Sequence, residues 1–351
     1  MKIIFAFIVA TGLSYIFTFP TIWLAKKINL VTDRKKRYHP AHTHKGVIPR
    51  GGGLPLILAF VITNLIFLPL NKIIIGVILA SVLLVITGLL DDYFDLSPYL
   101  RFLINLIVAC IIISFGVGIP YLSNPFGATI KLDTWQIPIF FFGFHIIWVW
   151  ADLLAIVWLS WTTNMVNWSK GVDGQLPGFV AIAAIFLGLL ARRFTAHDIS
   201  VETVSILCFI VAGIYAGFLP HNFYPQKIMP GYGGGALAGF LLGVLSILSF
   251  GKLGTIFLIL AFPLIDAVYT ILRRLKNKKS PFRADWGHFH HRLLEIGWGK
   301  RRIAVFYWIL TFILGIASLL SNQLEKVIIF ATIGALLLVF MLIIEKMKKV
   351  R

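Results

Sequence analysis

Apolar and polar segments alternate along the whole chain in a pattern typical of membrane-spanning helices. A helix needs about 20 mostly apolar residues to cross the hydrocarbon core of a bilayer. Eleven runs approach or reach this length: 3–24, 54–71, 73–90, 102–119, 138–161, 176–191, 201–219, 236–250, 253–272, 303–320 and 327–344. The pattern predicts an all-α integral membrane protein with about eleven transmembrane helices, in which residues 1–351 form a single polytopic domain.

Positive charge predicts how these helices are oriented. If the N-terminus lies outside, 25 of the 32 Lys and Arg residues fall in segments that face the cytoplasm. An excess of Lys and Arg on the cytoplasmic side is the rule for membrane proteins. We therefore expect an N-out and C-in arrangement, with membrane lipids around the helices.

Composition narrows the class of protein further. The chain is 59% hydrophobic and 13% charged, which excludes a soluble domain of this length. Its net charge of +18 fits loops beside anionic lipid head groups, so we expect no nucleic-acid partner. Cys110 and Cys208 both fall within apolar runs and predict neither a disulfide nor a metal site. The outward segment 120–137 combines a turn signal with alternating residues, which favours a short external β-hairpin.

Three carboxylates, Asp91, Asp92 and Asp95, follow the apolar run 73–90. Acidic side chains beside hydrocarbon are costly, and those that occur there are usually functional. Adjacent carboxylates repel one another unless a cation or a proton lies between them. Grouped carboxylate oxygens suit Mg²⁺, which proteins commonly share with substrate phosphates. The cluster thus favours a metal and phosphate site, and the alternative is a solvated acidic loop at a helix end.

Amide side chains mark the end of the fifth apolar run. Asn164 and Asn167 are three residues apart and share one helix face, so both amides could meet one ligand. Asp173 and Gly174 follow in the next turn. An amide both donates and accepts, as the edge of a base or a sugar requires. The alternative is a polar helix end before a turn.

A single carboxylate, Asp266, lies about two turns inside the ninth apolar run. An unpaired carboxylate at this depth is costly. Arg273 or Arg274, further along the same segment, is its expected partner.

Histidines gather in the most basic loop, as His288, His290 and His291, followed by Arg292. Imidazole and guanidinium groups can hold a diphosphate and stabilise a leaving phosphate. A zinc site is less favoured because the loop offers no cysteine. The remaining alternative is a solvated basic loop.

The polar segments on the expected cytoplasmic side fall into five motifs. They are His44–Gly53, Asp91–Leu96, Asn164–Gly174, Pro263–Arg274 and Ser280–Leu293. Together they resemble the polyprenyl-phosphate N-acetylhexosamine-1-phosphate transferase superfamily, glycosyltransferase family 4, over almost the whole chain. The last segment is close to the pattern S-P-x-x-A-D-x-x-H-x-H-H-R-L, which favours the WecA/TagO-like branch over the related MraY enzymes.

The resemblance implies a reaction and its partners. The expected enzyme transfers HexNAc-1-phosphate, in particular GlcNAc-1-phosphate, from a UDP-sugar to undecaprenyl phosphate and releases UMP. This would be the first membrane step of cell-envelope glycan synthesis, at the cytoplasmic face of the bacterial plasma (inner) membrane. The expected cofactor is Mg²⁺, with Mn²⁺ as a substitute, and a homodimer is expected.

The resemblance also assigns roles to residues. The implied catalytic residues are Asp91, Asp92, Asp173, His290 and His291. The implied substrate-binding residues are Lys45, Asn164, Asn167, Lys170, His288, Arg292 and Asp266. The implied metal ligands are Asp91, Asp92, Asn167 and Asp173. Whether Asp91 and Asp92 position Mg²⁺ or activate the lipid phosphate stays open.

Two positions depart from the superfamily pattern. Lys170 and Tyr232 stand where the pattern has aspartates, and the second of these is an expected Mg²⁺ ligand. Loss of a hard oxygen ligand should weaken Mg²⁺ binding. Either Lys170 supplies part of the missing positive charge at the diphosphate, or catalysis is altered. The alternative function is accordingly a catalytically degenerate relative that binds lipid phosphate or nucleotide sugar.

Overall fold

The structure is a computed structural model that describes residues 1–350 except 34–45, 141–143, 193–198, 250–252 and 281–285. Helices dominate the described residues. They are α1 (Lys2–Lys27), α2 (Gly53–Phe67), α3 (Lys72–Phe94), α4 (Pro98–Ser114), α5 (Val149–Trp168), α6 (Gln175–Ala191), α7 (Val201–Asn222), α8 (Gly231–Leu248), α9 (Leu253–Ile259), α10 (Ala261–Lys276), α11 (Phe289–Glu295), α12 (Lys300–Leu320) and α13 (Gln323–Val350).

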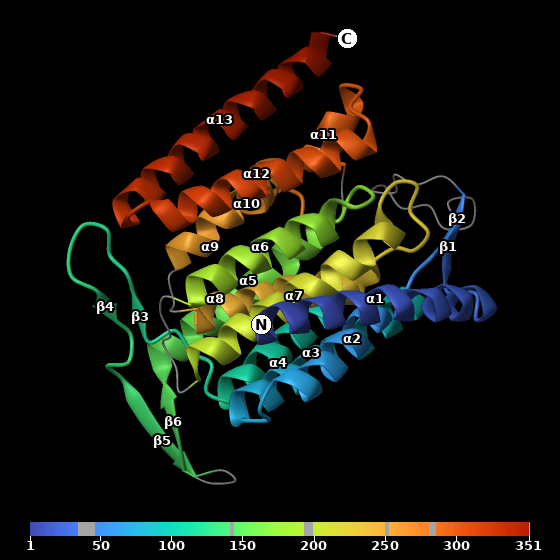
Figure 1. The fold of residues 1–351 in the computed structure, drawn as a ribbon. Helices are drawn as coiled ribbons and strands as arrows, with labels where there is room; N and C mark the ends of the chain where they lie inside the picture. The colour runs from blue at the N-terminus through green and yellow to red at the C-terminus, as the bar shows by residue number, and fades with distance from the viewer. Residues whose placement is uncertain (34–45, 141–143, 193–198, 250–252, 281–285, 351) are drawn as a thin grey trace.

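Three short antiparallel strand pairs accompany the helices. They are β1 (Val31–Asp33) with β2 (Val47–Pro49), β3 (Tyr121–Leu122) with β4 (Ile130–Lys131), and β5 (Gln136–Phe140) with β6 (Phe144–Trp148). Figure 1 shows β3–β6 at one end of the helix bundle and β1–β2 at the other. The β3–β4 pair lies within the segment 120–137, where alternation favours a hairpin. That it faces outwards stays a prediction.

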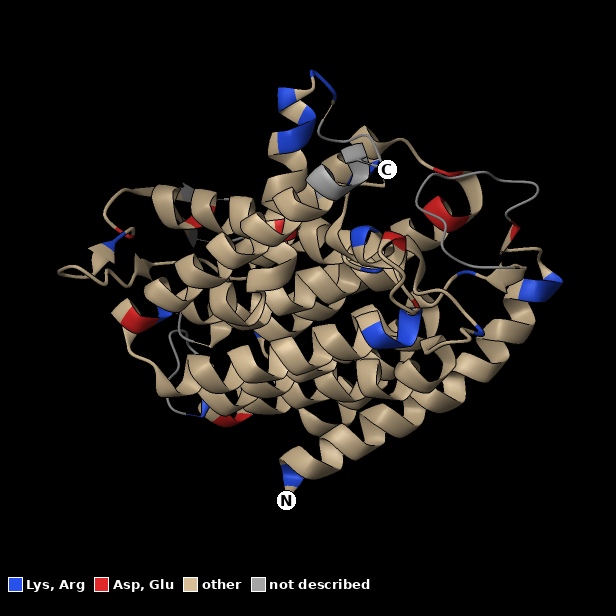
Figure 2. Ribbon diagram, turned by 90° about the horizontal axis from the view of Figure 1, so that it is seen from above, with Lys and Arg blue, Asp and Glu red and all other residues tan. Residues whose placement is uncertain are grey.

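Seven helices are long and apolar enough to cross a membrane, namely α1, α3, α5, α7, α8, α12 and α13. Helices α2, α4 and α6 are also apolar but shorter. In Figure 2 most of the helical ribbon carries no charge, and the Lys, Arg, Asp and Glu positions gather toward helix ends and loops. The chain is thus an α-helical integral membrane protein, whereas the count of eleven spans and the N-out orientation stay predictions.

The expected start of the fifth apolar run is wrong. Residues Gln136–Phe140 and Phe144–Trp148 form the β5–β6 pair, and α5 begins only at Val149. Pro138 lacks the N–H group that a helix interior requires. The branched side chains of Ile137 and Ile147, which are register partners, favour extended backbone.

The ninth apolar run is divided into two helices rather than one. Helix α9 ends at Ile259 and α10 begins at Ala261. Pro263 lies in the first turn of α10, where its missing N–H group costs least. This division places Asp266 in the second turn of α10, facing the interior of the protein.

Helix α8 lies at the centre of the bundle, and every one of its residues is buried. The backbone of its glycine-rich start contacts the backbone of α3. The two chains lie so close that a methyl group at Gly88 would overlap Gly233. Gly53, the first residue of α2, also lies against Gly233. Small residues permit such close approach of helices in membranes. The contact brings the start of α8 to the end of α3, which carries Asp91 and Asp92.

Candidate active site

Asp92 is the centre of a buried charged cluster, which we call the carboxylate pocket: Arg50, Asp91, Asp92, Arg101, Asn167, Lys170 and Tyr232. The Oδ1 of Asp92 accepts a hydrogen bond from the Tyr232 N–H at 3.1 Å, and its Oδ2 accepts one from the Gly51 N–H at 3.2 Å. The Arg50 Nε lies 3.5 Å from Oδ1. Donors from two distant segments and one guanidinium therefore stabilise the buried negative charge.

Gly231 permits this arrangement at the start of α8. Its φ of +67° is in the left-handed region, and a Cβ at this position would overlap the Asp92 carboxylate. Only glycine adopts this conformation at no steric cost and also leaves room for the carboxylate. The residue thus lets the first N–H groups of α8 face Asp92.

Asp91 has a different environment from its neighbour. Its Oδ2 lies 3.3 Å from the Arg101 guanidinium, and its Oδ1 is buried without a hydrogen-bond partner among the described residues. Asp95 does not join them, because it is exposed and ends α3 in the left-handed conformation. Of the two buried acids, Asp91 is thus the one with an acceptor atom that has no hydrogen-bond partner among the described residues.

Lys170 directs its ammonium group into the pocket. The Nζ donates to the Asn167 Oδ1 at 2.6 Å and to the Gly231 carbonyl oxygen at 2.7 Å. Burial lowers the pKa of Lys170 from 10.5 to about 8, and the negative charge of Asp92 opposes this shift. The amine is therefore mainly protonated at neutral pH.

Tyr232 extends from the pocket to the amides of two other helices. Its hydroxyl donates to the Asn105 Oδ1 at 3.1 Å, and the Asn105 Nδ2 donates to the Asn164 Oδ1 at 3.4 Å. Asn164 also donates to the Ser160 carbonyl oxygen at 2.8 Å. The predicted ligand-binding amide of Asn164 is thus held within the protein by its own neighbours.

Asp173 faces a separate set of partners. Its Oδ1 lies 3.0 Å from the Lys300 Nζ and accepts a hydrogen bond from the Gln226 Nε2 at 3.0 Å. Lys300 is the first residue of α12. The carboxylate therefore links the loop after α5 to the start of α12.

The histidine segment, which we define as His288–Arg292, is anchored on Asp266. The His288 Nδ1 lies 2.9 Å from the Asp266 Oδ2, and the Phe289 N–H donates to Oδ1 at 2.8 Å. The carboxylate thus fixes the orientation of the His288 ring. The expected pairing of Asp266 with Arg273 or Arg274 stays a prediction.

His290 and His291 are buried side by side, with ring centroids 4.2 Å apart. The His291 ring also stacks on Trp286 at 4.0 Å. Burial, and then the charges of His291 and His288, lower the pKa of His290 well below its ordinary value of 6.5. The His290 Nδ1 has no hydrogen-bond partner among the residues that the structure describes. His290 is therefore neutral at pH 7 and carries an open ring nitrogen.

Arg292 is engaged by the protein itself. It donates to the Gly287 carbonyl oxygen at 3.2 Å and to the Met341 carbonyl oxygen of α13 at 3.0 Å. Its guanidinium also lies 5.1 Å from the centre of the Tyr269 ring. These contacts hold the histidine segment between α10 and α13, and its predicted diphosphate contact stays a prediction.

Gly171 joins the carboxylate pocket to the histidine segment. A Cβ at this position would overlap the His290 Nε2, so the imidazole lies against the residue that follows Lys170. Trp168, in the same turn, lies 6.3 Å from the His288 ring. The carboxylate pocket and the histidine segment are therefore in contact with each other. Lys45 lies outside the described residues.

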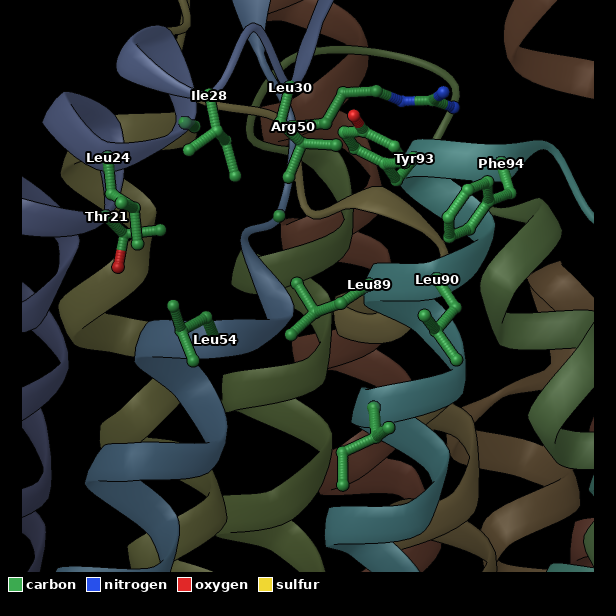
Figure 3. Close-up of a pocket in the computed structure, with 13 residues that line it drawn as sticks. Thr21, Leu24, Ile28, Leu30, Arg50, Leu54, Leu89, Leu90, Tyr93 and Phe94 are labelled. Atoms are coloured by element: carbon green, nitrogen blue, oxygen red, sulfur yellow. The ribbon is translucent and has the colours of Figure 1, made fainter.

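An apolar cavity of about 370 Å³ opens between α1, α2 and α3. Figure 3 shows Leu24, Leu54, Leu90 and Phe94 around it, with Arg50 at its rim. The same Arg50 contacts Asp92 in the carboxylate pocket. The apolar cavity thus borders the carboxylate pocket at Arg50.

The four predicted metal ligands each contact a base in this structure. The pairs are Asp91 with Arg101, Asp92 with Arg50, Asn167 with Lys170, and Asp173 with Lys300. Among the described residues, no three His, Cys, Asp or Glu side chains are grouped so that they could hold a metal ion. The arrangement of these side chains therefore does not fit a divalent ion.

Several residues of the site were not assigned as site residues from sequence: Arg50, Gly51, Arg101, Asn105, Gln226 and Lys300. Arg50 and Gly51 belong to the motif His44–Gly53. Arg101 and Lys300 share a signal, since each is a base in the first turn of a helix, and Arg50 lies three residues before α2 begins. Asn105 is a polar residue inside an apolar run, which is the same signal that marks Asp266.

Comparison with known sequences identifies the family. The profile of "Glycosyl transferase family 4" matches residues 74–250, which is half of the chain and includes Asp91, Asp92 and Tyr232. The chain belongs to glycosyl transferase family 4. The match ends before the histidine segment, so that segment is assigned to the family 4 site by its contacts with Gly171.

Relatives in family 4 extend the similarity over more of the chain. A probable undecaprenyl-phosphate N-acetylglucosaminyl 1-phosphate transferase of Bacillus subtilis is 29% identical, over 98% of this chain and 90% of that protein. A decaprenyl-phosphate N-acetylglucosaminephosphotransferase of Mycobacterium tuberculosis is 28% identical, over 88% of this chain and 80% of that protein. An undecaprenyl-phosphate alpha-N-acetylglucosaminyl 1-phosphate transferase of Thermotoga maritima is 30% identical, over 71% of this chain and 69% of that protein. The superfamily resemblance is thus confirmed.

Proposed function

We propose that this protein transfers a HexNAc-1-phosphate group, in the first instance GlcNAc-1-phosphate, from a UDP-sugar to undecaprenyl phosphate and releases UMP. The observation that carries the proposal is the position of Arg50, which borders an apolar cavity and contacts the buried Asp92. A prenyl chain in that cavity would have its phosphate beside the charged cluster. The names of the family 4 relatives support the same reaction.

The chemistry needs a positively charged surface that binds two phosphates. An oxygen of the acceptor phosphate attacks the sugar-bearing phosphorus, the bond to UMP breaks, and its electron pair stays on UMP. Positioning and charge stabilisation contribute most of the catalysis in phosphoryl transfer. Arg50, Arg101 and Lys170 supply the charge, and the open Oδ1 of Asp91 is placed to accept a proton from the acceptor phosphate.

The histidine segment supplies the second part of the site. The Asp266 carboxylate orients His288. The His290 Nε2 lies against Gly171, and the Nδ1 of the same ring has no hydrogen-bond partner among the described residues. The neutral imidazole of His290 can donate from one ring nitrogen to a diphosphate and accept at the other from a sugar hydroxyl, without repelling neighbouring cations. We assign the nucleotide sugar to this side and the lipid phosphate to the Arg50 side. We place the active site at the cytoplasmic face of the plasma membrane, and a homodimer stays a prediction.

A second function, binding without transfer, is favoured by one observation: the four predicted metal ligands already contact bases. UMP release by the protein in lipid nanodiscs, with undecaprenyl phosphate and a panel of UDP-HexNAc donors, separates the two functions. Turnover supports the transferase. Binding of donor and acceptor without turnover of any donor would establish the degenerate relative.

The same assay tests the lipid cavity. Leu54→Trp should fill the space between α1, α2 and α3 and raise the KM for undecaprenyl phosphate about tenfold, with the KM for the donor unchanged. Leu79→Trp is the matched control, because Leu79 lies on α3 but is exposed outside the cavity. Equal effects of the two variants would remove the cavity from the proposal.

A further inference from the structure

The Lys170 ammonium occupies a position that is surrounded by oxygen atoms. Its Nζ contacts the Asn167 Oδ1 at 2.6 Å and the Gly231 carbonyl oxygen at 2.7 Å. The carboxylates of Asp92 and Asp91 are close enough to stabilise its charge. Carboxylate, amide and carbonyl oxygens are the ligands that Mg²⁺ takes in proteins. Here the same kinds of atoms bind a side-chain cation.

The second departure, Tyr232, acts in the same direction. Its ring centre lies 5.3 Å from the Arg101 guanidinium carbon and 5.8 Å from the Lys170 Nζ. An aromatic ring at such distances stabilises a cation. Its hydroxyl is engaged by Asn105 at 3.1 Å and is directed away from Asp92. Relative to the family pattern, Lys170 adds a cation, and Tyr232 replaces an anion with a neutral aromatic ring beside that cation.

A divalent ion in this position would meet unfavourable charge. It would have to displace the ammonium from Asn167 and would lie near the guanidinium groups that contact Asp91 and Asp92. Like charges at such separations in a buried site repel strongly. Because Arg50 and Arg101 already compensate the negative charge of Asp92 and Asp91, these acids would bind an additional cation only weakly.

We propose that the Lys170 ammonium takes the place of a divalent metal ion in this site, so that the chain catalyses its transfer without one. The inference rests on the proposed function. In the step, the acceptor phosphate oxygen forms a bond to the sugar-bearing phosphorus, and the bond from that phosphorus to the UMP oxygen breaks. The electron pair stays on UMP, and an N–H of Lys170 donates to the oxygen that gains the charge. Lys170 does not lose its proton.

Metal binding tests this without any substrate. Mn²⁺ is titrated into the protein in nanodiscs of zwitterionic lipid, and free Mn²⁺ is followed by electron paramagnetic resonance. The natural chain should remove no more Mn²⁺ than empty nanodiscs. The double variant Lys170→Asp and Tyr232→Asp should bind one Mn²⁺ per chain, whereas Lys227→Asp, which makes the same Lys→Asp exchange in another loop, should not. Stoichiometric binding by the natural chain would overturn the inference, even if no variant folds.

Turnover provides the second readout. UMP release should be unchanged by EDTA, and Lys170→Met should lower it about 100-fold in EDTA and in Mg²⁺ alike. Turnover that appears only with Mg²⁺ would overturn the inference and leave the transferase function intact. Absence of turnover in every condition would instead refute the proposed function, and the Mn²⁺ titration would still decide whether Lys170 excludes a divalent ion.

Discussion

The carboxylate pocket and the histidine segment are both built on a buried aspartate, but they use it differently. Asp92 accepts backbone N–H groups from two distant places, Gly51 and Tyr232, and contacts the Arg50 guanidinium. Asp266 accepts from His288 and the adjacent Phe289 N–H. The pocket therefore depends on the assembly of α2, α3 and α8, whereas Asp266 of α10 binds two residues that are adjacent in the chain.

The largest expected effect comes from neutralising the pocket. Asp92→Asn keeps the size of the side chain but removes its charge and one of its two acceptor atoms, which leaves the Gly51 or Tyr232 N–H and the Arg50 guanidinium without compensation. We expect UMP release to fall about 1000-fold and the unfolding temperature to drop as well.

Asp95→Asn is the matched control for this prediction. It makes the same charge change at the same helix end, but Asp95 is exposed and left-handed, a conformation that asparagine tolerates. Similar losses in both variants would contradict a special role for Asp92.

A smaller effect is expected from the histidine segment. In Asp266→Asn a single oxygen must serve both His288 and the Phe289 N–H, so the His288 ring loses its fixed orientation. Turnover should fall about 10- to 100-fold, with little change in unfolding temperature. Glu295→Gln, an exposed change of equal charge at the end of α11, should leave turnover unaltered. A loss as large as that of Asp92→Asn would show that the two regions are not distinct.

The smallest effect concerns pH. Because burial lowers the pKa of His290, the folded protein resists protonation that the unfolded chain accepts below about pH 6.5. Stability should thus be complete above that pH and decrease as the pH falls below it, by at most about 1.4 kcal/mol per pH unit for one group. Unfolding temperatures measured from pH 7.5 to 5.5 should fall less steeply for His290→Gln than for the natural chain. Equal pH dependence of the unfolding temperature in the two proteins would contradict this role of His290.

The difference between the two regions also explains what sequence could predict. The histidine segment is contiguous, and one of its distant anchors, Asp266, is an isolated acid in an apolar run. The pocket is assembled from partners such as Arg50, Asp92 and Tyr232, which are separated by tens of residues and become neighbours only through helix packing. No periodicity in the chain reports that packing.

The helices themselves were largely predictable, because apolar length determines them. Ten of the eleven runs coincide with helical segments as expected, although the ninth is divided near Pro263. The fifth run failed at its start because hydrophobicity does not distinguish an apolar strand pair from an apolar helix. Pro138 was the residue that could have signalled the difference.

The bond from Arg292 to the Met341 carbonyl oxygen ties the histidine segment to α13, the least buried of the seven long apolar helices. That helix rests mainly against whatever surrounds the protein. A detergent that strips lipid from α13 would loosen the support of the histidines before it reached the glycine-packed pocket around α8. Inactivation on extraction would then begin at the periphery, and restoring an annulus of lipid would reverse it.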